Sequence, residues 1–326
     1  MKMIAQALAT ALVLTCSAVA AQAEYPDRSV TLVIPYAPGG ATDIAARNLT
    51  SVTPKYVPEP VLPVNRTGAG GATGSASVAN AKPDGYTMMV ARVGSHTVNP
   101  AMKSTLPYEI DDFDYVSVFE INPAVCAVSS ESDIKSMDDL IAEIEANPGD
   151  VSYGSAGVGS FLNIIAPMVV DAFGVEDVKN ALIHLPFRSG GEAATAVITG
   201  NADIICTNSS ALAGHIKNGA LRPLMVTTKE PVEGIDAPTA NELGHAELNV
   251  LVGWSGIAGP KGLPEEVKTK WTEWLKQIGE DEEYLKRVKD LGSVPVEMTT
   301  EESVEFINEQ YEAFRELVVK LDLQVD

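Results

Sequence analysis

The chain has 326 residues, of which 45% are hydrophobic, and its 44 acidic and 23 basic residues give a formal net charge of −21. The apolar fraction excludes a disordered chain, and the acidic excess excludes a general nucleic-acid binder, which needs basic surface. A soluble globular protein of two lobes is expected at roughly 150 residues per domain. An anionic ligand would have to be attracted by local positive groups, because the overall field repels it.

The first 23 residues are typical of a cleaved secretory signal. Lys2 supplies a positive charge, an Ala/Leu/Val run follows over residues 4–19, and Ala21-Gln22-Ala23 fits a small-residue cleavage site. A membrane anchor is disfavoured because the run is shorter than the roughly 20 residues of a span. A lipid anchor on Cys16 is disfavoured by Thr15 before it. We therefore expect a mature periplasmic chain of 303 residues with a charge of −22.

Strand and helix patterns alternate through the first third of the mature chain. The continuously apolar run 29–36 predicts a buried parallel strand, and a glycine turn leads from it into a helix over 42–52. A second strand is expected at 61–64, followed by a glycine-rich segment and a small-residue helix that ends at Ala79. A third strand is expected at 87–91. These units predict an α/β lobe with a mostly parallel sheet.

A second series of the same kind begins at Pro123 and predicts a second α/β lobe. Its expected strands are 123–129, 150–154, 181–185, 202–206 and 221–227, with helices over 137–146, from the turn after residue 160 to 173, from Glu192 and from Leu212. The last hundred residues predict a strand at 250–258 and two helices with apolar stripes, at 264–279 and 304–318. No later segment is long and apolar enough to cross a bilayer.

Two cysteines remain in the expected mature chain. Cys126 and Cys206 both lie in apolar, strand-like runs, which favours buried free thiols over the alternative of a disulfide between them. Neither spacing resembles a metal-binding or redox motif.

Two glycine-containing loops are the candidate ligand sites. They follow predicted strands and open predicted helices, at 37–43 and 154–160. The carboxyl ends of strands are where open α/β sheets bind ligands, and helix N-termini present free N–H groups to an anion. Ser155 and Ser160 would add hydroxyl donors. The alternative is a plain turn in which Thr42, Asp43 or Ser160 caps its helix.

Other common chemistries find no motif in this sequence. No glycine run has the dinucleotide fingerprint or a following phosphate-loop lysine, and Gly253-Trp-Ser-Gly256 is one residue short of the serine-hydrolase elbow. The four histidines are scattered without metal-ligand spacing. We therefore expect no catalytic residue, no metal and no cofactor.

Two arginines follow predicted strands, where a ligand would lie. Arg92 comes directly after the strand 87–91, and Arg188 follows the strand 181–185. A guanidinium group pairs with a carboxylate through two parallel hydrogen bonds, and so supplies the local positive charge that an acidic receptor needs. A surface ion pair with one of the many acids is the alternative.

Taken together, the motifs of the mature chain resemble those of the solute-binding proteins of tripartite tricarboxylate transporters, the Bug proteins. The segments that carry the resemblance are Ile34-Pro-Tyr-Ala-Pro-Gly-Gly-Ala-Thr-Asp43, Val64-Asn-Arg-Thr-Gly-Ala-Gly-Gly71, Lys82-Pro-Asp-Gly-Tyr86, Val98-Asn-Pro100, Tyr153-Gly-Ser-Ala-Gly-Val-Gly-Ser160, Pro186-Phe-Arg-Ser-Gly-Gly191, Gly200-Asn-Ala-Asp203, 215–222 and 254–264. Each motif is weak, but their order and spacing are specific.

The resemblance implies a type II-like periplasmic-binding-protein fold of two α/β lobes joined by two crossing strands. Lobe 1 would comprise residues 24–124 plus 227–326, and lobe 2 residues 125–226. A small di- or tricarboxylate would bind between the lobes of a monomer and be delivered to membrane permease subunits. The residues that the loops and the resemblance nominate for ligand binding are Tyr36, Ala37, Pro38, Gly39, Gly40, Thr42, Asp43, Arg92, Ser95, His96, Ser155, Ala156, Gly157, Val158, Gly159, Ser160, Arg188, Ser189, Gly190 and Asn208.

Two departures from the family pattern make the expected site less negative. Family members usually have small or hydroxyl residues near Arg92, and many have Asp-Asn where this chain has Thr207-Asn208. Both changes favour a ligand with more than one carboxylate. The alternative functions are a ligand sensor for a signalling system, which would use the same site, and an extracytoplasmic hydrolase, for which the sequence offers no activated nucleophile.

Overall fold

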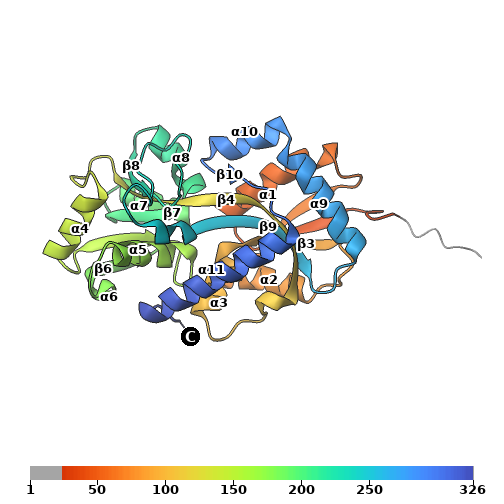
Figure 1. The fold of residues 1–326 in the computed structure, drawn as a ribbon, viewed down its shortest axis with the longest axis horizontal. Coiled ribbons are helices and arrows are strands. Elements are labelled where there is room, and N and C mark those ends of the chain that lie inside the picture. The colour runs from red at the N-terminus through yellow and green to blue at the C-terminus, as the bar shows by residue number, and fades with distance from the viewer. Residues whose placement is uncertain (1–23, 326) are drawn as a thin grey trace, which may run out of the picture.

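The computed structural model describes residues 24–325, so the expected signal at 1–23 lies outside the described residues. Two α/β lobes lie end to end along the long axis of the molecule and are joined by the long strand β4 (Phe113–Ser129) (Figure 1). The predicted two-lobe fold is confirmed.

The first lobe has parallel strands at one edge of its sheet and antiparallel strands beside them. The order is β2-β1-β3-β9-β4, with the two-residue β10 also on β4. The strands, in chain order, are β1 (Val30–Ile34), β2 (Val61–Asn65), β3 (Thr87–Arg92), β9 (Val252–Pro260) and β10 (Val294–Pro295). The helices of this part are α1 (Ala41–Val52), α2 (Ala72–Ala79), α3 (Asn99–Met102), α9 (Glu265–Gly279), α10 (Glu282–Asp290) and α11 (Thr300–Lys320).

The second lobe repeats this arrangement around the other half of β4. Strands β6, β5 and β7 are parallel, whereas β4 pairs antiparallel with both β7 and β8. The strands are β5 (Val151–Ser155), β6 (Leu182–Pro186), β7 (Ile204–Asn208) and β8 (Leu221–Val226). The helices are α4 (Met137–Ala146), α5 (Phe161–Ala172), α6 (Val178–Ala181), α7 (Gly190–Ile198) and α8 (Ser209–Lys217). Short helical turns complete the chain at η1 (Thr53–Lys55), η2 (Ala69–Gly71), η3 (Gly94–Val98), η4 (Ile110–Asp112) and η5 (Ala246–Val250).

Strand β4 changes partners where it passes from one lobe to the other. Residues 113–123 pair with β9, and from Ala124 onward the strand pairs with β7 and β8. The chain returns through the segment between β8 and β9. The sequence predicted a strand only from Pro123, because Asp114, Glu120 and Asn122 interrupt the apolar pattern of the first ten residues; the structure buries Glu120 and Asn122 inside the sheet.

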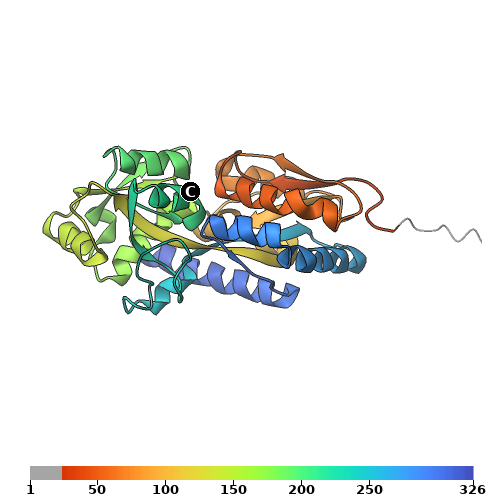
Figure 2. The ribbon, with the colours of Figure 1, turned by 90° about the horizontal axis from the view of Figure 1, so that it is seen from above.

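Helices cover both faces of each sheet. In the first lobe, α1, α9 and α10 pack on one face around Trp271, and α2, α3 and α11 pack on the other, as Figure 2 shows for α1 and α11. Helix α11 continues across to the second lobe, where Phe314 lies 6.0 Å from Phe161 between ring centres and Lys320 pairs with Asp171 at 2.6 Å. One apolar core therefore runs through both lobes behind the sheet. None of the helices in residues 24–325 has the length and hydrophobicity that crossing a bilayer requires.

The expectation of two free thiols was wrong. Cys126 and Cys206 form a disulfide between β4 and β7, with their Cα atoms 4.0 Å apart and both side chains fully buried. The two residues are direct register partners in this antiparallel pair, the geometry that brings opposite side chains closest. Burial was predicted correctly, but the pairing depends on the register between two strands whose cysteines are 80 positions apart in the sequence, which sequence reasoning does not reveal.

Candidate functional site

The strand register makes the ends of the parallel strands in the two lobes point toward each other. Arg92, the last residue of β3, aligns through Ser255 of β9 with Glu120 of β4, whereas Asn208, the last residue of β7, aligns with Ala124. β3 runs in the direction of β4 and β7 runs against it. The two ends are therefore separated by four residues of β4, about 13 Å along the strand. We call residues 120–124 of β4 and the strand ends beside them the lobe junction.

The loop after β1 is held in place by Asp43. Its Oδ2 accepts hydrogen bonds from the Gly39 N–H and from Arg47 Nε, both at 2.9 Å, and its Oδ1 accepts one from Asn65 Nδ2 at 2.9 Å. These hydrogen bonds lower the pKa of Asp43 against the effect of its burial. Neither Asp43 nor Thr42 is exposed, whereas Ala37, Pro38 and Gly39 are. Asp43 therefore holds the loop in position, and residues 37–39 of the loop remain exposed to solvent.

Tyr36 joins this loop to the glycine-rich segment that follows β2. Its hydroxyl donates to the carbonyl of Gly70 at 3.0 Å. A Cβ on Gly71 would lie 2.9 Å from the Tyr36 ring, and one on Gly94 would lie 2.4 Å from its hydroxyl. The glycines are needed for this close approach. Burial raises the pKa of Tyr36 to about 12, so the phenol stays protonated as a hydrogen-bond donor.

The loop after β5 is built from its own polar groups. Ser155 Oγ lies 2.6 Å from His184 Nε2 and accepts from the Gly157 N–H at 3.1 Å, and Ser160 Oγ donates to the Gly157 carbonyl at 2.7 Å. Asn163 accepts from the Gly159 N–H at 3.0 Å. We expected the two serine hydroxyls to serve a ligand, but the structure uses both inside the loop. Ala156 and Gly157 stay partly exposed and Val158 is 59% exposed.

Sequence reasoning missed the residues that support this loop. His184 stacks on Tyr153 with ring centres 4.9 Å apart, and its pKa is lowered by burial. Asn163 bonds to the Tyr153 hydroxyl at 3.1 Å. His184 was interpreted as one of four scattered histidines, because only the pairing of β5 with β6 brings it beside Ser155.

Lys103, also missed, lies between the loops of the two lobes. A Cβ on Gly70 of the first lobe and one on Gly159 of the second would each lie 3.6 Å from Lys103 Nζ. Asn99 Oδ1 approaches the same two positions, at 3.2 and 3.9 Å. Burial lowers the pKa of Lys103. A cation therefore stands where the 155–160 loop meets the first lobe.

The two predicted arginines have different surroundings. Arg92 is 3% exposed, donates to Ser255 Oγ at 2.6 Å and lies in the field of Glu120. The side chain of Arg188 is 90% exposed and pairs with Glu192 at 2.7 Å, one helical turn along α7. Arg188 matches the alternative of a surface ion pair, whereas Arg92 is a buried cation at the lobe junction.

Ser95 and His96 are buried rather than displayed. Both are fully buried in the helical turn after β3, and the His96 ring lies 4.7 Å from Phe113 and 5.8 Å from Tyr115 between centres. Desolvation lowers the pKa of His96 to about 3, so the ring is neutral. We expected His96 to face the ligand; the structure places it in an aromatic core, with Nδ1 2.9 Å from Ser95 Oγ.

The remaining predicted residues lie at strand ends of the second lobe. Ser189 caps α7 by accepting from the Glu192 N–H at 3.2 Å, and Gly190 packs near Leu162. The Oδ1 atom of Asn208 lies 2.1 Å from where a Cβ on Gly253 would be. Gly253 therefore leaves room for an amide of the second lobe to reach the strand that belongs to the first.

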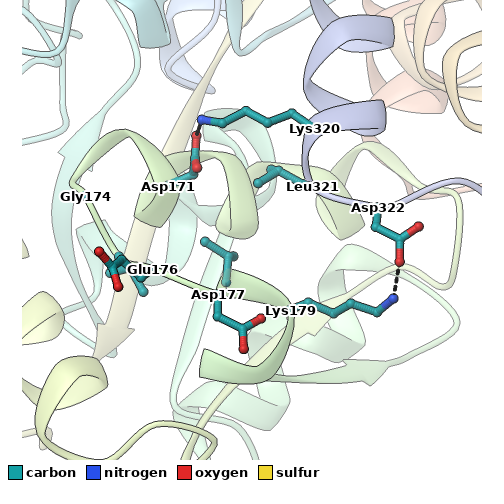
Figure 3. Close-up of a pocket in the computed structure, with 10 residues that line it drawn as sticks. Asp171, Gly174, Glu176, Asp177, Lys179, Lys320, Leu321 and Asp322 are labelled. Atoms are coloured by element: carbon teal, nitrogen blue, oxygen red, sulfur yellow. Dashed lines mark hydrogen bonds and ion pairs between the residues drawn. The ribbon is translucent and has the colours of Figure 1, made fainter.

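A separate cavity of about 500 Å³ lies away from the lobe junction, between the end of α11 and the segment joining α5 to α6 (Figure 3). Lys320 pairs with Asp171 and Lys179 pairs with Asp322 across it. Two further acids, Glu176 and Asp177, give its lining a negative balance, which disfavours an anionic ligand. None of the predicted site residues lines this cavity.

The comparisons with known proteins agree with the motifs and the fold. The family model described as "Tripartite tricarboxylate transporter family receptor" matches residues 45–323. A protein of Agrobacterium vitis, the UPF0065 protein in the TAR-I ttuE-ttuC' intergenic region, is 32% identical over 278 residues, which are 85% of this chain and 78% of the relative.

Two solved structures extend the match to the three-dimensional fold. The periplasmic binding protein BugD is 27% identical with a TM-score of 0.81, covering 92% of this chain and 99% of its own. MatC from Rhodopseudomonas palustris, solved with bound malate, is 25% identical with a TM-score of 0.80, covering 90% and 100%. This chain therefore belongs to the family of tripartite tricarboxylate transporter receptors, periplasmic binding proteins that bind a solute and are not enzymes.

Proposed function

We propose that this protein captures a small organic acid at the lobe junction and delivers it to the membrane subunits of a tripartite tricarboxylate transporter. The family membership supports a receptor role, and the malate in the related MatC structure supports a carboxylate as the ligand. The proposal includes secretion into the periplasm with removal of residues 1–23, and action as a monomer whose lobes divide near residues 124–125 and 226–227.

One observation carries the proposal: the strand register places the carboxyl ends of β3 in the first lobe and β7 in the second lobe at opposite sides of residues 120–124 of β4. Helices α1 and α5 each have 12 residues, and neither of their N-cap residues, Gly40 and Ser160, makes a side-chain capping hydrogen bond. Their first-turn N–H groups therefore have no side-chain cap to compete with an anion. Arg92 adds a buried guanidinium group at the lobe junction.

The loop residues and Lys103 take different roles in this proposal. The backbones of residues 37–40 and 156–159 contact the ligand, whereas Asp43, Ser155 and Ser160 hold those loops in shape. Lys103 and Asn208 approach the ligand from the two sides of the junction. Contacts available only when both loops engage the ligand would drive the lobes together.

A thermal-shift screen tests the proposal. The mature protein, stripped of carried-over ligand by dialysis in denaturant and refolding, is mixed with a panel of mono-, di- and tricarboxylates. A ligand at about 100 times its dissociation constant adds roughly 2.7 kcal/mol of stability, which gives a clear rise in melting temperature. Arg92→Met is expected to abolish the shift, whereas Arg188→Met, the matched control on the surface, retains it. A flat response of the wild-type protein to every acid would refute the carboxylate receptor.

A further inference from the structure

A row of buried polar side chains crosses the sheet at the lobe junction. Arg92 Nη1 donates to Ser255 Oγ at 2.6 Å, and Ser255 is the register partner of Glu120. Asn122, two residues further along the same face of β4, donates from Nδ2 to Glu120 Oε1 at 2.5 Å and to Ser293 Oγ at 2.6 Å. The row thus connects three strands, β3, β9 and β4, with the segment before β10.

The same row ends at the second lobe. Ser293 follows Gly292, whose carbonyl accepts a hydrogen bond from Ser209 Oγ of the second lobe at 2.6 Å. On the adjacent strand, Gly253 pairs with Asn122 and lies against Asn208. The polar row therefore occupies the segment of β4 on which the strand ends of both lobes converge.

Each of its three central side chains keeps one polar atom unpaired. Arg92 and Glu120 are 3% exposed and Asn122 is fully buried. Arg92 Nη2, Glu120 Oε2 and Asn122 Oδ1 have no hydrogen-bond partner among residues 24–325. Arg92 and Glu120 attract each other through space, but these two atoms do not bond to each other. Buried polar atoms in native proteins are nearly always paired, so a bound polar group would supply the hydrogen bonds that these three atoms lack.

The unpaired atoms specify the chemistry of that group. Arg92 Nη2 is a donor, which suits a carboxylate oxygen. Glu120 Oε2 accepts when ionised, and Asn122 Oδ1 accepts because the donor end of its amide is already committed to Glu120 and Ser293. A plain dicarboxylate offers no donor to these two acceptors and would bring a second negative charge toward Glu120.

We propose that Arg92, Glu120 and Asn122 form a subsite for a carboxylate that carries a hydroxyl or ammonium group beside it, so that the ligand is a hydroxy acid or an amino acid. This inference rests on the proposed carboxylate-receptor function. Arg92 binds the carboxylate, and Glu120 and Asn122 accept hydrogen bonds from the adjacent hydroxyl or ammonium group. Glu120 and Asn122 are thus specificity-determining residues.

Calorimetric titration of the wild-type protein with matched acids tests the subsite. The sets are succinate, malate and aspartate; glutarate and glutamate; and tricarballylate and citrate. Within the set that binds most tightly, the substituted acid is expected to bind at least about tenfold more tightly than its unsubstituted counterpart, as hydrogen bonds to charged groups allow. Equal affinities within every set would overturn the subsite and leave the carboxylate receptor intact. Absence of binding by every acid would overturn the receptor as well.

One variant and its matched control test whether the preference depends on Glu120. Glu120→Gln is expected to reduce the preference at least fivefold, because the substituted acid loses an acceptor and the unsubstituted acid is no longer opposed by the negative charge of Glu120. Glu145→Gln, an exposed acid on α4, removes the same charge elsewhere and is expected to leave both affinities unchanged. A preference that survives in Glu120→Gln would refute the role of Glu120. If that variant fails to fold, the matched comparison in the wild-type protein still decides whether the subsite exists.

Discussion

The disulfide between Cys126 and Cys206 is expected to account for a large share of this protein's stability. It closes a loop with a sequence separation of 80 residues. In the chain-entropy description, cross-linking such a loop removes about 4.5 kcal/mol of conformational freedom from the unfolded chain. Domains are typically stable by only about 5–15 kcal/mol, so loss of the cross-link is expected to leave a marginal fold.

Equilibrium unfolding tests the contribution of this buried disulfide. Urea unfolding of the mature protein, followed by tryptophan fluorescence, is compared between wild type and Cys126→Ala/Cys206→Ala. The free energy of unfolding is expected to fall by about 4 kcal/mol or more, because the substitutions also remove two buried sulfur atoms. Reductant is expected to destabilise the wild type and to have no effect on the double variant, which serves as its control.

Two results would refute this reasoning. The first is a double variant as stable as the wild type. The second is a pair of reactive thiols in unreduced protein comprising residues 24–326 after denaturation, because this part of the chain contains no cysteine besides Cys126 and Cys206.

Three further predictions concern pH and charge. Burial lowers the pKa of His96 from its ordinary 6.5 to about 3, so between these pH values the unfolded chain binds a proton that the folded chain does not. The free energy of unfolding of the wild type should therefore fall by about 2 kcal/mol more than that of His96→Gln between pH 8 and pH 5, measured by urea titration. Equal losses in the two proteins would contradict a neutral buried His96. Arg92→Met removes the positive charge that counteracts the burial-raised pKa of Glu120. A carboxyl group whose folded-state pKa is raised destabilises the fold at pH values above its ordinary pKa, so the variant should lose more stability at pH 8 than at pH 5. A loss of stability that does not depend on pH would show that the two groups are not coupled. Lys103→Gln should weaken carboxylate binding by about tenfold in calorimetry, as expected for the loss of one charged contact. Lys103→Arg, which keeps the charge, and Lys276→Gln, an exposed control, should bind as the wild type does. Unchanged affinity in Lys103→Gln would show that Lys103 is not part of the site.

Much of the fold was predictable because local signals agree with the tertiary structure. The apolar run before Tyr36 and the glycine turn after it gave β1 and α1 within a residue or two, and the helix 137–146 was predicted with its exact bounds. Helix α10 was missed because only Tyr284 and Val288 of its nine residues are buried, so its apolar stripe is too narrow to stand out.

The candidate site was predictable as loops but not as chemistry. Glycines between a strand and a helix marked 37–43 and 155–160, because that backbone requirement is local. The roles of side chains in them were not local: Asp43 finds Arg47 one turn away but also Asn65 from the next strand, and Ser155 finds His184 from a neighbouring strand. Each of these side chains therefore has at least one partner that only strand pairing supplies.

The sequence by itself determined the family, the two α/β lobes and the glycine loops, because these depend on motif order, hydrophobic periodicity and backbone freedom. Only the tertiary structure decided which polar groups meet. Strand register paired Cys126 with Cys206 and aligned Arg92 with Ser255 and Glu120. The packing of the two lobes placed Lys103 beside Gly159. Tertiary packing also distinguished two arginines that both follow predicted strands: Arg92 is buried, whereas Arg188 is exposed. The sequence does not show this difference, because burial depends on contacts between segments far apart in the chain.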